Sequence, residues 1–109
     1  ANGFAEEVQR LLVVTSNLAC FQSAAERYQC WIDGGMFAMT LVYALHSQGL
    51  VSCCLNWSKE PPVDRLSRRV LGITPEETIV LLIAVGKPLE EFAVAVSARR
   101  SLEEVIVWR

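Results

Sequence analysis

The sequence lacks any strong excess of charge. Its 109 residues carry ten basic and twelve acidic side chains, for a net charge of −2. A nucleic-acid or anionic-lipid surface needs clustered positive charge, so neither is expected as a partner. The chain also lacks a basic start followed by an apolar run, and its apolar runs are shorter than a bilayer span. We therefore expect no contact with nucleic acid and none with a membrane.

Residues for metal binding or nucleophilic catalysis are few. The one histidine, His46, lies in an expected helix without partners at a suitable spacing, which indicates a structural role. Cys53 and Cys54 form an adjacent pair that does not easily close on itself, while Cys20 and Cys30 are distant singles. We predict no metal site and four reduced, core-filling thiols, with Cys53 and Cys54 in a buried strand. Reduced thiols place the protein in the cytoplasm.

A glycine-rich phosphate loop is also missing. Gly34 and Gly35 have neither the spacing nor the lysine of a P-loop. They lie near the start of an expected helix, where a missing side chain permits close packing. Asp33 is interpreted as a helix cap or as a charge at the positive helix end, in preference to a general base. The catalytic residues therefore remain unassigned.

Apolar residues, by contrast, are abundant at 52% of the chain. A chain of this length holds one core, so we predict a single domain over residues 1–109. The composition is more apolar than a soluble monomer of this size needs. Part of the surface is therefore expected to be covered by a second copy, as in a homodimer.

Short apolar and β-branched runs predict the strands. The last of them is a continuous apolar run, which is typical of a central strand that is buried on both faces. The other two are closed by turn-forming residues. The predicted strands cover residues 11–15, 51–55 and 78–85.

Helices are predicted between and after these strands. Residues 23–26 match a capping box, which indicates a helix start. Residues 33–48 are apolar on nearly every face and end before Gly49, so this long helix should be buried all round, with its own two-fold mate as cover. A shorter helix begins at Pro61 and ends at Gly72. A second helix-start pattern lies at residues 101–104. The resulting order of strands and helices is typical of an α/β or α+β sandwich.

The one local basic cluster is the pair Arg99 and Arg100. Guanidinium groups match phosphate oxygens in a bidentate manner, so the pair could clamp a phosphate. When the pair is considered alone, the preferred interpretation is that both arginines are surface residues that keep the segment before the C-terminal tail in contact with water.

Several segments, taken in order, resemble the FMN-dependent nitroreductase family. Residues 31–50 resemble its long dimer-interface helix, with Asp33, Gly34, an apolar face and a final Gly49-Leu50. Residues 99–105 are similar to its C-terminal Arg-x-Pro-Leu-Glu-Glu signature. Further similarity lies in residues 52–57, 71–73 and 79–88. The resemblance implies an α+β fold, namely the C-terminal part of a three-layer sandwich with a central sheet and a long buried helix at the dimer interface.

The resemblance also implies a function. Family members bind FMN at the dimer interface, take electrons from NADH or NADPH and transfer hydride to nitro compounds, quinones or similar small oxidants. By alignment, Leu55, Asn56 and Trp57 fall where the backbone passes the flavin ring, although the family often has Gly-Gly in place of Asn56-Trp57. Arg99 falls beside the FMN phosphate, and Ser97 replaces a lysine that often helps to hold it.

Two segments of full-length members are absent from the sequence. They are the N-terminal Arg-Arg-Ser-x-Arg-like segment, which holds the FMN phosphate and ribityl chain, and a Pro-Ser-x-x-Asn-like loop. The chain is therefore expected to lack the N-terminal part of its own flavin site. The alternative function is a truncated or degenerate relative that keeps the dimer core, binds no flavin and serves as a structural or interaction protein.

Overall fold

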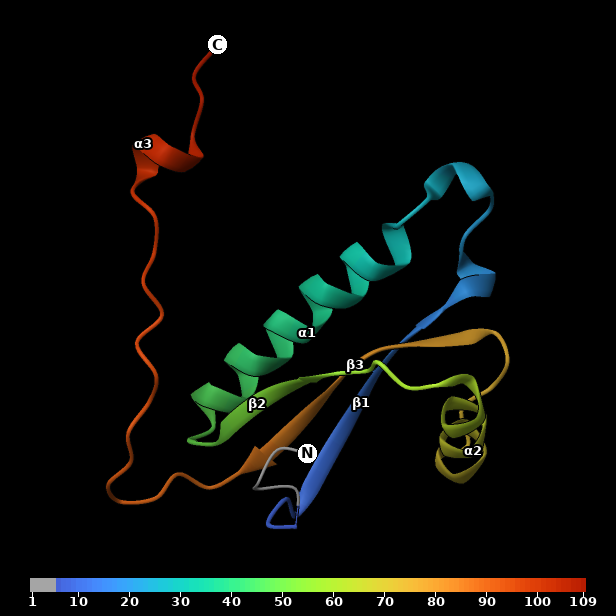
Figure 1. Cartoon of the computed structure of the whole chain (residues 1–109), viewed down its shortest axis with the longest axis horizontal. Coiled ribbons are helices and arrows are strands. Elements are labelled where there is room, and N and C mark those ends of the chain that lie inside the picture. Colours follow the sequence, from blue (N-terminus) through green and yellow to red (C-terminus); the bar gives the residue numbers. More distant parts are fainter. Residues whose placement is uncertain (1–5) are drawn as a thin grey trace.

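The computed structural model describes residues 6–109, so residues 1–5 of the predicted domain lie outside the described part. A three-stranded antiparallel sheet has the order β1-β3-β2, and α1 lies across one of its faces (Figure 1). Two 3-10 turns, η1 (Leu18–Cys20) and η2 (Ala24–Glu26), separate β1 from α1. The expected α+β fold and all three strands are confirmed. The larger elements are β1 (Arg10–Asn17), α1 (Gln29–Ser47), β2 (Val51–Asn56), α2 (Pro61–Leu71), β3 (Glu77–Gly86) and α3 (Leu102–Val105).

The central strand β3 contains a bulge. Val14 of β1 pairs with Leu81, but the next residue, Thr15, pairs with Ile79, so Val80 has no partner on β1. As a result Val80 and Leu81 both pack against the core beneath α1. This core is formed by Val14, Ala38 and Ile83, which are at most 3% exposed.

The opposite face of the sheet is only partly covered. Leu11 on β1 and Cys53 on β2 both pair with Ala84 of β3 and so share this face. Leu11 is 44% exposed, and Val51 at the start of β2 is 37% exposed. The prediction that β3 is the central strand is confirmed. The prediction that β3 is buried on both of its faces is confirmed only in part within this chain, because α1 covers only one face of the sheet.

At Gly34, α1 approaches the sheet closely. A Cβ added to this buried glycine would lie 2.6 Å from Cγ2 of Val80 and 3.3 Å from its Cβ. The side chain of Val80 is β-branched and stiff, so it cannot easily turn away. A Cβ on Gly35 would meet nothing within 4 Å. The close-packing interpretation is therefore correct for Gly34 and wrong for Gly35 within this chain.

We expect Gly34→Ala to destabilise the fold by about 1–2 kcal/mol, since overpacking a core costs about 1–3 kcal/mol and alanine regains up to about 1 kcal/mol of helix propensity. Urea unfolding measures the change. Gly35→Ala is the matched control and should leave stability unchanged or raise it. The explanation also requires that Val80→Ala partly rescues Gly34→Ala. Equal stability of Gly34→Ala and the parent chain would contradict the contact.

The start of the long helix differs from the expectation. The capping box forms, with Glu26 Oε1 accepting from Ser23 N at 3.0 Å and Ser23 Oγ accepting from Ala25 N at 3.2 Å, but it caps only η2. Arg27 then takes a positive φ of 49°, which ends the turn, and α1 begins at Gln29. The predicted helix start at residue 23 is confirmed only for a short 3-10 helix, and the long helix begins at Gln29 instead of residue 33. The cap role of Asp33 was wrong, because Asp33 lies inside α1 and accepts from Gln29 Nε2 at 2.7 Å.

The other helix ends follow their sequence signals. Pro61 opens α2, and Gly72 closes it with a left-handed φ of 68°. Gly49 follows α1 with a φ of 73°. The start pattern at Ser101 yields only the four-residue helix α3. Of the helices in residues 6–109, none is both long and apolar enough for a membrane span.

The C-terminal arm, residues 87–109, leaves β3 and runs apart from the sheet to α3 (Figure 1). Every residue of the arm is exposed. The radius of gyration is 16.9 Å, whereas a compact chain of this length has about 13 Å. The arm therefore adds little to the core of its own chain.

Candidate functional site

Three of the predicted site residues lie together at the end of β2. Leu55 pairs with Leu82 and Asn56 with Leu81, after which the chain leaves the sheet towards α2. Asn56 is exposed, while Leu55 and Trp57 are half-buried. Because β2 is an edge strand, this segment borders the sheet where a ligand can approach the backbone.

A hydrogen-bonded network fixes Trp57. Its indole Nε1 donates to Asp64 Oδ1 of α2 at 2.7 Å, and Arg68 Nε donates to the other carboxylate oxygen, Oδ2, at 2.7 Å. Arg68 Nη1 also donates to the backbone oxygen of Glu77 at 2.6 Å. The Trp57 N–H first, and Arg68 second, lower the pKa of Asp64 below its usual range. Asp64 is thus ionised at neutral pH and links Trp57 to α2.

The i,i+4 spacing of Asp64 and Arg68 on α2 is a sequence signal for an ion pair, which the structure contains. No sequence signal connected Trp57 with Asp64, since that contact depends on how the loop between β2 and α2 turns.

The network continues into the sheet through Glu77. Its carboxylate accepts from Thr74 N at 3.0 Å, Thr15 Oγ1 at 2.9 Å and Thr74 Oγ1 at 3.2 Å. The Thr74 backbone N–H, followed by the Thr15 hydroxyl, lowers the pKa of Glu77. Together with the bond from Arg68 to the Glu77 backbone, these contacts tie α2 to β1 and to the start of β3.

Glu77 should make stability depend on pH. Its pKa is lower in the folded state than in the unfolded chain, so its contribution is present above about pH 4.3, the ordinary value for Glu, and is lost as pH falls through the folded value. We expect Glu77→Gln to lower the urea midpoint at pH 7 and to flatten its decline below about pH 4.5. Glu76→Gln, which changes an exposed neighbour, is the control and should decline like the parent. Parallel declines for Glu77→Gln and the parent would contradict this role.

The other two predicted site residues lie in the C-terminal arm. Arg99 Nη1 donates to the Ser97 backbone oxygen at 3.2 Å and contacts Ser97 Oγ. Both residues are exposed. The arm and the segment between β2 and α2 lie on opposite sides of the molecule (Figure 1). Within one chain, Ser97 therefore lies beside Arg99, and Leu55, Asn56 and Trp57 lie together. These two groups of predicted site residues lie apart from each other.

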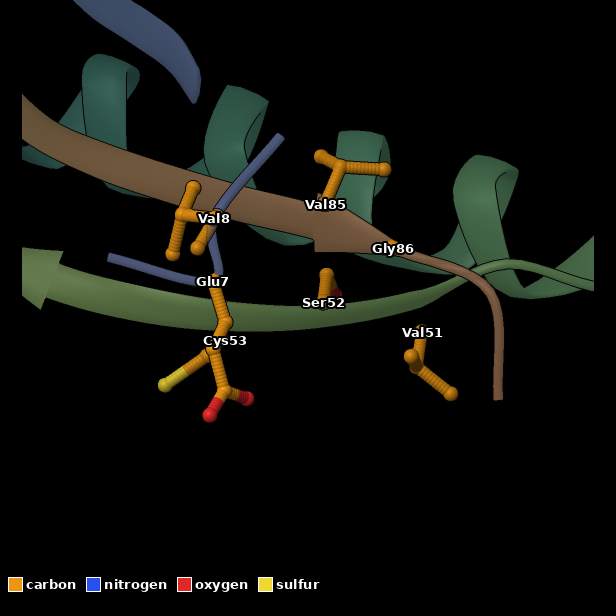
Figure 2. Close-up of a pocket in the computed structure, with 8 residues that line it drawn as sticks. Glu7, Val8, Val51, Ser52, Cys53, Val85 and Gly86 are labelled. Carbon is orange, nitrogen blue, oxygen red and sulfur yellow. The ribbon is translucent and has the colours of Figure 1, made fainter. Parts of the chain in front are cut away.

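A cavity of about 290 Å³ opens at the start of β2 (Figure 2), and Trp57 does not line it. Within residues 6–109, no group of three His, Cys, Asp or Glu side chains could hold a metal. All four cysteines are free thiols, but only Cys30 is buried. The expected burial of Cys20, Cys53 and Cys54 was wrong, because Cys20 lies in the exposed 3-10 turn η1 and the other two lie on the edge strand β2. The cavity is lined by Glu7, Val8, Val51, Ser52, Cys53, Ala84, Val85 and Gly86.

Comparisons with known proteins give a consistent result. The model of the Nitroreductase family matches residues 4–87. This range contains Leu55, Asn56 and Trp57, whereas Ser97 and Arg99 lie beyond it. The solved structure of the nitroreductase family protein from Streptococcus pneumoniae TIGR4 is 28% identical, with a TM-score of 0.64, and the match covers 84% of this chain and 43% of that chain. The chain therefore spans less than half of that protein. The curated proteins contain no match.

Proposed function

Because the chain belongs to the nitroreductase family, we propose that it forms part of an FMN-dependent oxidoreductase. Electrons would come from NADH or NADPH, and nitro compounds, quinones or similar small oxidants would receive them. Family membership supports the general oxidoreductase role, and the match over residues 4–87 carries the proposal. The free thiols support a cytoplasmic location.

The chemistry of the site residues fits FMN. The exposed Asn56 and the fixed, half-buried Trp57 at a sheet edge suit a flat ring, while the Arg99 guanidinium and Ser97 hydroxyl suit a phosphate. When bound, FMN would supply the hydride chemistry. The protein's part is to orient the ring along β2 and to neutralise the phosphate. Since one chain keeps these two groups apart, we propose that the site combines Trp57 of one copy with Arg99 of a second.

The outward face of α1 supports such a homodimer. Ile32, Met36, Met39 and Tyr43 are between 47% and 65% exposed and follow one another at intervals of four, three and four residues. This is the spacing of apolar residues at a helix-helix contact. We call these four residues the α1 stripe. We predicted that this helix is buried on every side, but within one chain its outward face is exposed. We therefore propose that α1 of a second copy covers this face.

The C-terminal arm supports the same assembly. Of the residues that the structure describes, the arm carries the two most exposed large apolar side chains, Val96 at 95% and Trp108 at 89%. Several large apolar side chains that are exposed on one segment mark a surface that a partner covers. The arm also carries Ser97 and Arg99. An arm that lies against a second copy would therefore both bury apolar surface and deliver the phosphate contact.

The absorbance spectrum of the purified chain, with and without added FMN, tests the proposal. A yellow preparation with the band of oxidised flavin, or a saturable change when FMN is added, would support it. NADH and NADPH oxidation with a quinone or a nitro compound then identifies the donor and the oxidant class. A chain that stays colourless after incubation with FMN would contradict the proposal and favour the flavin-free structural or interaction protein.

A further inference from the structure

The network around Trp57 has a feature that the family resemblance does not explain, namely a carboxylate whose two oxygens accept from two different side chains. Asp64 accepts from Trp57 with Oδ1 and from Arg68 with Oδ2. We propose that Asp64 is a positioning residue that fixes the indole ring of Trp57, and with it the end of β2, beside the flavin. This inference rests on the proposed function, because Trp57 matters to catalysis only if FMN binds there.

The contacts make the position of the ring well defined. Asp64 and Arg68 are 26% and 24% exposed, so their bond is partly shielded from water. Hydrogen bonds to an ionised group are stronger than neutral ones, and partial shielding strengthens them further. Arg68 is held in turn by the Glu77 backbone at the start of β3. The indole is thus connected to the sheet through two charged side chains.

Apolar packing contributes less to the placement of α2. Leu66 is 61% exposed and Val70 is 76% exposed, so much of the apolar surface of this helix faces away from the chain's core. The hydrogen bonds of Asp64 and Arg68 therefore have a large share in holding α2 against Trp57. Loss of Asp64 would free both the helix and the ring, whereas loss of the exposed Glu60, just before α2, would free neither.

The first test needs no flavin. In the ¹⁵N-labelled chain, the indole N–H resonance of Trp57 is assigned by its loss in Trp57→Phe. Asp64→Ala should move this resonance and speed its exchange with water, while the resonances of Trp31 and Trp108 stay in place. Asp64→Asn, which keeps an acceptor oxygen, should restore most of the parent signal. Glu60→Gln removes a charge just before α2 without touching Trp57 and should leave the signal unchanged.

The second test is FMN affinity in the same proteins, measured by quenching of flavin fluorescence. Asp64→Ala should weaken binding by about tenfold, with partial recovery in Asp64→Asn and no change in Glu60→Gln. Trp57→Phe combined with Asp64→Ala should be no weaker than the worse single variant, because the two act through one hydrogen bond.

The outcomes separate this inference from the proposed function. An unchanged Trp57 resonance in Asp64→Ala would overturn the inference, as would a changed resonance with parent-like FMN affinity or fully additive effects. Absence of FMN binding by the parent would overturn the proposed function and the flavin role of Asp64 together, and the indole signal would still report the contact. If Asp64→Ala fails to fold, Asp64→Asn decides. It keeps an acceptor oxygen but loses the charge that strengthens the bond, so it should shift the Trp57 resonance part of the way, whereas Glu60→Gln should not shift it. An Asp64→Asn resonance identical to that of the parent would overturn the inference.

Discussion

Met36→Glu is expected to weaken self-association of the chain by about a thousandfold or more, because burial of an unpaired carboxylate costs several kcal/mol and a two-fold axis applies the change in both copies. Met36 lies in the α1 stripe and is 60% exposed, so the substitution spares the core of its own chain. Glutamate and methionine have similar helix propensities, which keeps α1 intact. Sedimentation equilibrium over a range of concentrations measures the dissociation constant.

The matched control is Leu66→Glu on α2, which replaces a side chain of similar exposure, 61%, with the same charge. It should leave the dissociation constant close to that of the parent. If the flavin site combines residues of two copies, Met36→Glu should also lose FMN affinity in proportion to the loss of dimer. A parent chain that is monomeric at micromolar concentration, or a Met36→Glu variant that dimerises like the parent, would refute the role of the α1 stripe.

Arg99→Ala is expected to weaken FMN binding by roughly ten- to a hundredfold, the usual consequence of losing one charged donor to a phosphate. A dianionic phosphate at an interface needs at least one such donor. Arg99 also holds Ser97, so its loss would leave the hydroxyl of Ser97 without its neighbour. Quenching of flavin fluorescence at fixed salt measures the affinity, and the salt must be fixed because charged contacts are screened.

Arg100→Ala provides the comparison for Arg99→Ala. Both substitutions remove one positive charge from the same exposed part of the arm, so a general electrostatic effect would change both affinities alike. We expect a much smaller change for Arg100→Ala. Equal affinities of Arg99→Ala and the parent would show that the family's phosphate contact does not extend to this position, which lies beyond the residues matched by the family model.

The strands could be predicted because their signals are local. Each predicted strand lies within an observed one, and β3 is central as its continuous apolar run indicated. The helix α2 was bounded correctly by Pro61 and Gly72 for the same reason. The capping box at residues 23–26 shows the limit of such signals. Its hydrogen bonds form, yet Arg27 turns the chain, and α1 begins only at Gln29.

The candidate site was less accessible from the sequence. The resemblance placed Leu55, Asn56 and Trp57 on one segment, but it could not show that Asp64 holds Trp57. It also gave no indication that the arm carries Arg99 away from that segment. Both facts depend on the path of the chain between elements, which short-range patterns do not determine.

The sequence by itself determined where strands and helices form, which residues end them and to which family the chain is related, because backbone preferences and apolar periodicity act over a few neighbouring residues. The tertiary structure alone decided the bulge at Val80, the close approach of Gly34 and the contact of Trp57 with Asp64. It also decided that α1 and the arm expose apolar side chains. Such contacts join residues that are distant in sequence, so they depend on strand register and loop path, and a shift of one residue changes which side chains meet.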